Sequence, residues 1–244
     1  GNGEVGAWGI HILDDVRNVA LLDRVTLPKR IMAGGARIVY NDAAETPNVC
    51  FAWYDTGGAP VVLGLSNLQT KDDPKNPGMF PGPGSGYILY GQGGRLHGWR
   101  GGAIAYDAEG KEIRRFKGTG GQAEHAKNFI DAVLAHDSSL LHADAKIGND
   151  SCGWCNLVDI ATRTGHELSK SELAEVSDPA GVWNDVIAGH EALLATYDTS
   201  MEKLGFKLSS VIEIEDGRFV GEDAEKANTL LKRTYRDGFQ FPDI

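Results

Sequence analysis

The chain has 244 residues, and its 34 acidic against 24 basic side chains give a formal net charge of −10. This balance disfavours nucleic-acid phosphates and anionic lipid surfaces, so we expect small molecules or other protein chains as partners. No apolar run approaches the roughly 20 residues that cross a bilayer, and three cysteines are too few for a disulfide framework.

The first eleven residues contain a glycine pattern. Gly1, Gly3 and Gly6 fit G-x-G-x-x-G, the fingerprint of a dinucleotide-binding turn. Such a turn needs a buried strand in front of it, so that the glycines bring a pyrophosphate onto the next helix N-terminus, and no residue precedes Gly1 in this sequence. We therefore favour a flexible glycine loop that feeds a helix over about residues 8–22. Apolar residues at helical spacing support this helix, namely Trp8, Ile12, Val16, Val19 and Leu22.

This first helix would present an imidazole beside two carboxylates. His11, Asp14 and Asp15 are three and four residues apart, so they lie on neighbouring parts of one helix face. A carboxylate one turn from an imidazole can orient it as a general acid or base. The alternative is a histidine that only hydrogen-bonds where loop and helix meet, and the spacing alone favours this structural role.

Strand signals dominate between residues 28 and 118, without intervening helices. A loop over residues 69–85, rich in proline, divides them, and loops of this length are often functional. The succession of short strands predicts one large, mostly antiparallel sheet. The expected strands are 28–33, 36–40, 48–55, 60–68, 87–90, 95–99, 103–107 and 112–117.

Helices to cover this sheet follow it in the chain. Apolar spacing predicts helices over residues 123–134, 151–163 and about 179–204. We therefore predict the α+β class, with a large, mostly antiparallel open sheet and helices packed on one face. The whole chain, 1–244, is expected to form a single domain. Its parts are a catalytic-loop helix (1–22), the sheet (28–118), the helices (121–208) and a C-terminal tail (209–244) with a short helix at about 224–233.

Other side chains are weaker candidates for a site. Arg17 could bind an anion or be an ordinary solvated helix charge, and His125 could reach a sugar hydroxyl or be a plain surface histidine. Trp99 beside Arg100 could stack on a sugar, although a plain strand face is the simpler interpretation. Cys152-x-x-Cys155 has the spacing of redox sites and of half a zinc site, but there is no second cysteine pair, and a helix with two core cysteines is the simpler interpretation. The spacing of the acidic residues matches no recognised calcium pattern, so no metal ligand is expected.

Several stretches resemble Gfo/Idh/MocA oxidoreductases, in the segment that follows their Rossmann domain. The opening GNGEVGAWGIHILD, residues 1–14, matches the family's glycines, its Gly-x-His and an Asp three residues later. Further stretches look like members of the family from planctomycetes and related bacteria. They are ETPN at 45–48, residues 120–133, NLVDIATR at 156–163, and FVGEDAEKAN at 219–228 with Tyr235-Arg236.

The resemblance implies the C-terminal α/β domain of that family, an open sheet with helices on one face and a partner subunit on the other. It implies hydride transfer between NAD or NADP and a sugar or cyclitol hydroxyl. His11 would act as acid or base, and Asp14 would support its helix or contact substrate. We assign Trp8, Asp15, Arg17 and His125 as candidate substrate contacts. The cofactor-binding residues stay unknown.

Two departures from the family pattern matter. Ala7 stands where many members carry a loop aspartate, and the nucleotide-binding half is missing from this sequence, so a Rossmann-domain segment is an expected partner. A binding or assembly module without catalysis therefore stays open as an alternative, as does a hydrolase or lyase that uses His11 and Asp14 without a cofactor. The compartment, cytoplasmic or periplasmic, is undecided.

Overall fold

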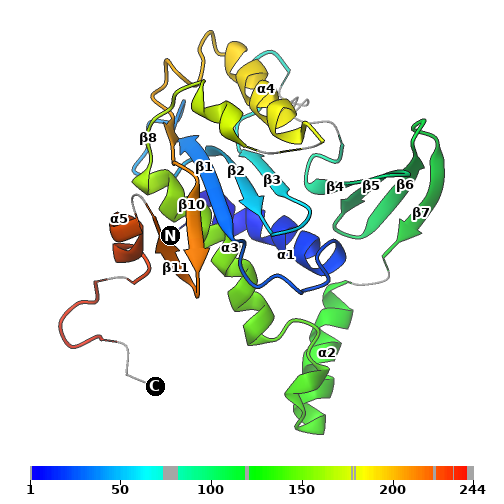
Figure 1. Cartoon of the computed structure of the whole chain (residues 1–244). Helices are drawn as coiled ribbons and strands as arrows, with labels where there is room; N and C mark the ends of the chain where they lie inside the picture. The colour runs from blue at the N-terminus through cyan, green and yellow to red at the C-terminus, as the bar shows by residue number, and fades with distance from the viewer. Residues whose placement is uncertain are drawn as a thin grey trace.

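The computed structural model describes residues 2–73, 82–118, 121–176, 178, 180–221, 224–232 and 234–240. Gly1, residues 74–81 of the proline-rich loop, Gly120 and the last four residues lie outside this set. The described chain combines a large antiparallel open sheet with helices, so the predicted α+β class is confirmed (Figure 1). No helix in these ranges combines the length and the apolar composition that a bilayer crossing requires.

The larger sheet is built around two buried strands, β1 (Arg30–Ala36) and β2 (Val49–Asp55), which pair antiparallel over their whole length. The sheet order is β11-β10-β1-β2-β3, with β3 at Val61–Ser66, β10 at Ile212–Glu215 and β11 at Arg218–Val220. The short strands β8 (His166–Glu167) and β9 (Lys207–Leu208) pair with each other, and β9 also pairs with β1. Residues 209–244, expected to be a tail, therefore supply two strands of the sheet.

Helices cover both faces of this sheet, whereas the sequence analysis expected them on one. Alternate residues of β1 and β2 point to opposite faces. Ile31 and Ala52 belong to a buried cluster with Trp154 of α3 (Ala145–Thr164). Met32 and Phe51 belong to a second buried cluster, with Trp183 of α4 (Val182–Ala195). The helices lie on both faces because β1 and β2 are apolar on both sides, so each face must be covered to exclude water.

A second sheet stands apart from the first. It has four strands in the order β4-β5-β6-β7, at Gly86–Gly91, Gly94–Trp99, Gly102–Asp107 and Glu112–Lys117. The strands were expected at these positions, but in one sheet with β1 to β3. Each connects to the next by a tight turn, such as Asp107 to Gly110, where the Gly110 N–H donates to the Asp107 carbonyl at 3.1 Å. Short local turns favour pairing within the hairpins over pairing across residues 67–85.

The helix α2 (Gln122–Ala135) projects from the body of the molecule at the bottom of Figure 1. It packs against the short 3₁₀ helix η2 (Ser138–Leu140), and Asn128 ties the two together, since its side-chain amide donates to the Leu140 carbonyl at 2.7 Å. Much of its apolar surface faces solvent. The exposed side chains are Phe129, Ile130, Val133 and Leu134.

Candidate functional site

Gly3, Gly6 and Gly9 belong to a helix rather than to a flexible loop. The chain is helical from Gly3, passes through a π-helical turn η1 (Val5–Gly9) and continues as α1 (Ile10–Val19). This geometry is unlike the strand–turn–helix that holds a pyrophosphate. The helix also ends three residues earlier than expected, because Leu22 and Asp23 adopt positive φ angles of 53°. A π-turn often marks a functional position in a helix, and this one directly precedes the segment that carries His11.

A pocket of about 270 Å³ lies against this helix. Two walls are formed by α1 and by the start of α3, and Arg100, in the turn between β5 and β6, forms a third. The pocket therefore brings together three of the residues that the sequence singled out, His11, Asp14 and Asp15. The full lining is Ile10, His11, Asp14, Asp15, Arg100, Ala143, Ile147, Gly148, Ser151 and Cys152.

A second hollow, of about 340 Å³, lies on the four-stranded sheet. It is shallower than the first pocket. Its polar side chains are Tyr90, Arg95 and Tyr106, and no Asp or Glu lines it. Acid–base chemistry needs groups that exchange protons near neutral pH within reach of one another. We therefore take the pocket beside α1 as the candidate site, and call it the α1–α3 pocket.

Trp8 lies at the rim of the α1–α3 pocket rather than in its lining. Its ring meets His11 edge-on, with centroids 5.7 Å apart, and its indole N–H donates to the Ser85 hydroxyl at 3.0 Å. The guanidinium carbon of Arg100 lies 5.8 Å from the ring centre. Trp8 is 47% exposed. It therefore connects η1 with two segments beside the second sheet, the residue before β4 and the β5–β6 turn, and it leaves apolar ring surface open beside the imidazole.

Asp14 is held from behind by a short chain of hydrogen bonds. The Ser151 hydroxyl donates to Asp14 Oδ1 at 2.5 Å and accepts from Arg17 Nη1 at 2.5 Å. Because a guanidinium can only donate, it occupies a lone pair of the hydroxyl and leaves the hydroxyl proton for the carboxylate. The chain Arg17–Ser151–Asp14 thus fixes one carboxylate oxygen of a pocket residue.

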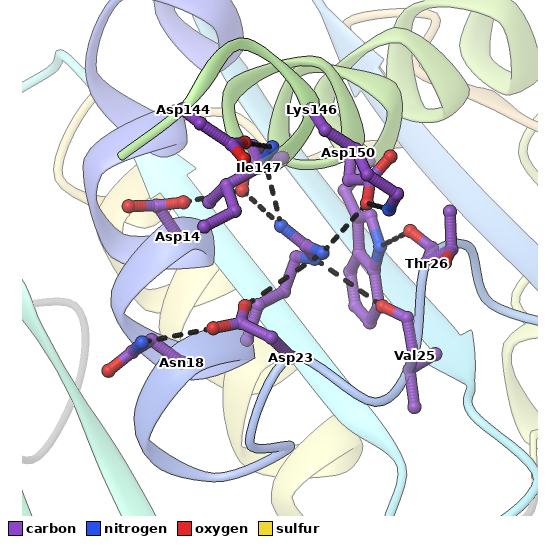
Figure 2. Close-up of polar contacts among 12 residues, drawn as sticks. Asp14, Asn18, Asp23, Val25, Thr26, Asp144, Lys146, Ile147 and Asp150 are labelled. Atoms are coloured by element: carbon purple, nitrogen blue, oxygen red, sulfur yellow. Dashed lines mark hydrogen bonds and ion pairs between the residues drawn. The ribbon is translucent and has the colours of Figure 1, made fainter. Parts of the chain in front are cut away.

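Arg17 itself is buried, with 1% of its side chain exposed. Its guanidinium reaches the carbonyls of Val25 and Ile147, at 3.4 and 3.3 Å, and it lies 3.6 Å from Asp150 and 3.9 Å from Asp23. Figure 2 shows these carbonyls and carboxylates arranged around one centre between α1 and α3. This corrects both expectations for Arg17, since a side chain enclosed in this way is neither a solvated helix charge nor a contact for an anion from solvent.

The pKa of the Asp15 carboxyl is raised above its ordinary value. Partial burial raises the pKa of its carboxyl, the neighbouring Asp14 charge raises it further, and Arg100 and His11 partly oppose the shift. The charged form of Asp15 is therefore more costly in the folded protein than in the unfolded chain. Such a cost is typical of groups kept for binding or catalysis, although structural networks produce it as well.

Replacing Asp15 with asparagine is expected to stabilise the protein at pH 7, by up to about 1 kcal/mol for a half-exposed group. A raised folded pKa means that stability falls as pH rises from the ordinary value of 3.8 through the folded value. The gain should therefore disappear below about pH 3.8, where the carboxyl is protonated in both states. Urea unfolding at several pH values measures this, with the exposed acid Asp72→Asn as control. An unchanged or lower stability of Asp15→Asn at pH 7 would contradict the expected cost.

His125 does not join the site. It lies in the first turn of α2, is exposed, and lines neither hollow. Sequence reasoning in turn missed Ser151, Gly148 and Cys152, which reach the α1–α3 pocket from the first half of α3. The usable signal was Asp144, whose carboxylate caps this helix by accepting from the Ile147 N–H at 2.8 Å. Recognising that cap would have extended the helix six residues toward its N-terminus.

The described residues do not fit a nicotinamide dinucleotide. Of the glycines that match its fingerprint, Gly3 begins the first helix and Gly6 lies in its π-helical turn, and within the described ranges no strand–glycine turn–helix unit faces the α1–α3 pocket. The same ranges also contain no group of three or more His, Cys, Asp or Glu side chains placed to hold a metal ion.

Comparison with known proteins leaves the family open. No family model matches the chain, and no curated protein matches it. A solved structure from Klebsiella pneumoniae, described as a "putative oxidoreductase", is similar over 92% of this chain at 13% identity, with a TM-score of 0.41. The chain spans about half of that protein, 52% of its length.

Proposed function

We propose that this chain is the substrate-binding part of an NAD- or NADP-dependent oxidoreductase that acts on a sugar or cyclitol hydroxyl. One observation carries the proposal: the α1–α3 pocket gathers His11 and Asp14, which the resemblance to Gfo/Idh/MocA oxidoreductases marks as candidates, with Asp15, which shares their helix face. The exposure of His11 at this pocket agrees with a role toward a ligand from solvent.

In this proposal His11 takes the proton of the substrate hydroxyl. The face of Trp8 offers a flat apolar surface to the sugar ring, and Asp14 and Asp15 accept hydrogen bonds from neighbouring hydroxyls. The Ser151 contact uses one lone pair of Asp14 Oδ1, so the other carboxylate oxygen is the freer acceptor for substrate. The described residues do not fit the dinucleotide. In this proposal the cofactor is therefore bound by a Rossmann-domain segment of the intact protein, the partner that the resemblance implies.

The test is turnover by the intact protein. Incubation with NAD or NADP and a panel of sugars and cyclitols should form reduced nicotinamide, followed by its absorbance. The absence of turnover with every polyol would remove the enzymatic proposal. It would leave the binding of sugars to be measured separately on this chain.

Filling the α1–α3 pocket gives a second test that does not depend on catalysis. Gly148 lines the pocket, and a Cβ placed there would meet no heavy atom within 4 Å. Gly148→Leu should therefore weaken sugar binding at least tenfold, while removal of a helical glycine stabilises the fold by about 0.5–1 kcal/mol.

Calorimetric titration and urea unfolding measure the two effects of Gly148→Leu. The matched control is Gly148→Ala, which keeps the gain in stability but adds only one methyl group to the pocket. Sugar binding by the leucine variant at the unmodified affinity would show that the ligand binds elsewhere.

A binding module without catalysis is the second candidate. The helical form of the glycine segment favours it, because it leaves the described chain without a dinucleotide turn. Titration of the intact protein with NAD separates the two candidates, since micromolar binding would contradict the module.

Self-association is also part of the proposal. Both faces of the larger sheet are covered, so the four-stranded sheet is the open one in the described chain, and its outer strand β7 is exposed throughout. Sedimentation velocity of the chain and of Phe116→Glu, on β7, tests whether this sheet joins two copies.

A further inference from the structure

Arg100 is the cation of the α1–α3 pocket, and the fold leaves its hydrogen-bonding groups unused. Within the described residues its guanidinium makes no hydrogen bond and no ion pair within 4.0 Å; its contact is the face of Trp8. It is close enough to Asp15 to lower the pKa of that carboxyl, without pairing with it. Arg100 therefore has a free set of N–H donors beside the pocket.

The chemistry of such a group is specific. A guanidinium has five donors in a planar fork that matches a carboxylate or a phosphate, and stacking on an aromatic ring leaves the edge of the fork free. The acidic part of the pocket disfavours an anion. Asp14 and Asp15 are acceptors, which suit hydroxyl groups and repel an anion.

The two preferences together describe one ligand. An uncharged polyol would satisfy the carboxylates but leave the Arg100 fork without a partner, and a simple anion would satisfy Arg100 but meet two carboxylates. A molecule with hydroxyls at one end and a negative charge at the other satisfies both.

We propose that the α1–α3 pocket binds a polyol that carries an anionic group, a carboxylate or a phosphate, and that Arg100 determines this specificity. Arg100 binds the anion, while Asp14 and Asp15 accept from the hydroxyls. This rests on the proposed function, because it refines the substrate class of the same site.

The experiment is calorimetric titration of the chain with three probes at fixed ionic strength: D-glucitol, D-gluconate and D-glucose 6-phosphate. We expect at least one anionic probe to bind about tenfold or more tightly than glucitol, as a charge-assisted hydrogen bond provides. The carboxylate and phosphate probes show which anion is preferred. Arg100→Ala should abolish the preference, because it weakens binding of the anionic probes about tenfold more than binding of glucitol, and Arg100→Lys should restore part of the preference.

The control is Arg95→Ala, on the strand before the Arg100 turn, whose guanidinium stacks on Tyr106 and lines the other hollow. It should keep the anion preference. Equal affinities for glucitol and both anions, or a preference that survives Arg100→Ala, would overturn this proposal alone. No binding of any of the three probes would overturn it together with the proposed sugar site.

Discussion

Arg17→Met is expected to lower the free energy of unfolding by about 3–5 kcal/mol, the usual cost of removing one partner from a buried ionic cluster. The methionine keeps most of the side-chain volume, so the loss reports the polar groups left behind. These are the carbonyls of Val25 and Ile147, the Ser151 hydroxyl, and the largely buried carboxylate of Asp150, which keeps the exposed Lys146 as an ion-pair partner at 2.8 Å. Urea denaturation followed by circular dichroism measures the change.

The matched control for Arg17→Met is Arg163→Met on α3. Arg163 pairs with Asp159 at 3.1 Å, one turn away, but about half of its side chain is exposed. An exposed pair of this kind contributes less than about 1 kcal/mol. A loss for Arg17→Met no larger than the loss for Arg163→Met would show that the buried cluster does not hold α1 to α3.

The sequence predicts the helix that carries the site residues, but not the buried contacts of Arg17 that hold this helix to α3. The three- and four-residue spacing of His11, Asp14 and Asp15 is local, so helical periodicity alone predicts their common side. Val25 and Asp23 are near Arg17 in the chain, but its other partners, Ile147, Asp150 and Ser151, lie 130 and more residues away on α3. An arginine in an amphipathic helix is normally solvated, and only the packed structure reveals a compensating cluster.

The same division between local and distant determinants applies to the sheets. The positions of β4 to β7 follow from glycine and acidic turn residues within each hairpin, and the sequence predicts all four strands. Their separation from β1–β3 depends on which edges pair in space, which no strand's own residues decide. Arg100 belongs to this second kind of information, because a turn of the separate sheet brings it to the pocket.

His11→Ala is expected to reduce turnover by the intact protein about 10²–10⁴-fold, the usual contribution of a positioned general acid or base. Since His11 is exposed and its contact is with the rim residue Trp8, the substitution should leave the unfolding transition almost unchanged. A purely structural histidine at the helix start would give the opposite pattern, with lower stability and little change in turnover. Turnover and unfolding measured together therefore decide whether His11 is an acid–base group or a structural histidine.

The control for His11→Ala is His125→Ala, on the projecting helix α2 and outside both hollows. We expect its turnover to stay within about twofold of the unmodified protein, because groups that do not touch the reacting atoms leave transition-state stabilisation unchanged. If His125→Ala lost as much activity as His11→Ala, the reaction would require α2 to close onto the pocket. If neither variant lost activity, proton transfer would belong to a different group, and the chemical assignment of the α1–α3 pocket would be wrong even where sugars bind to it.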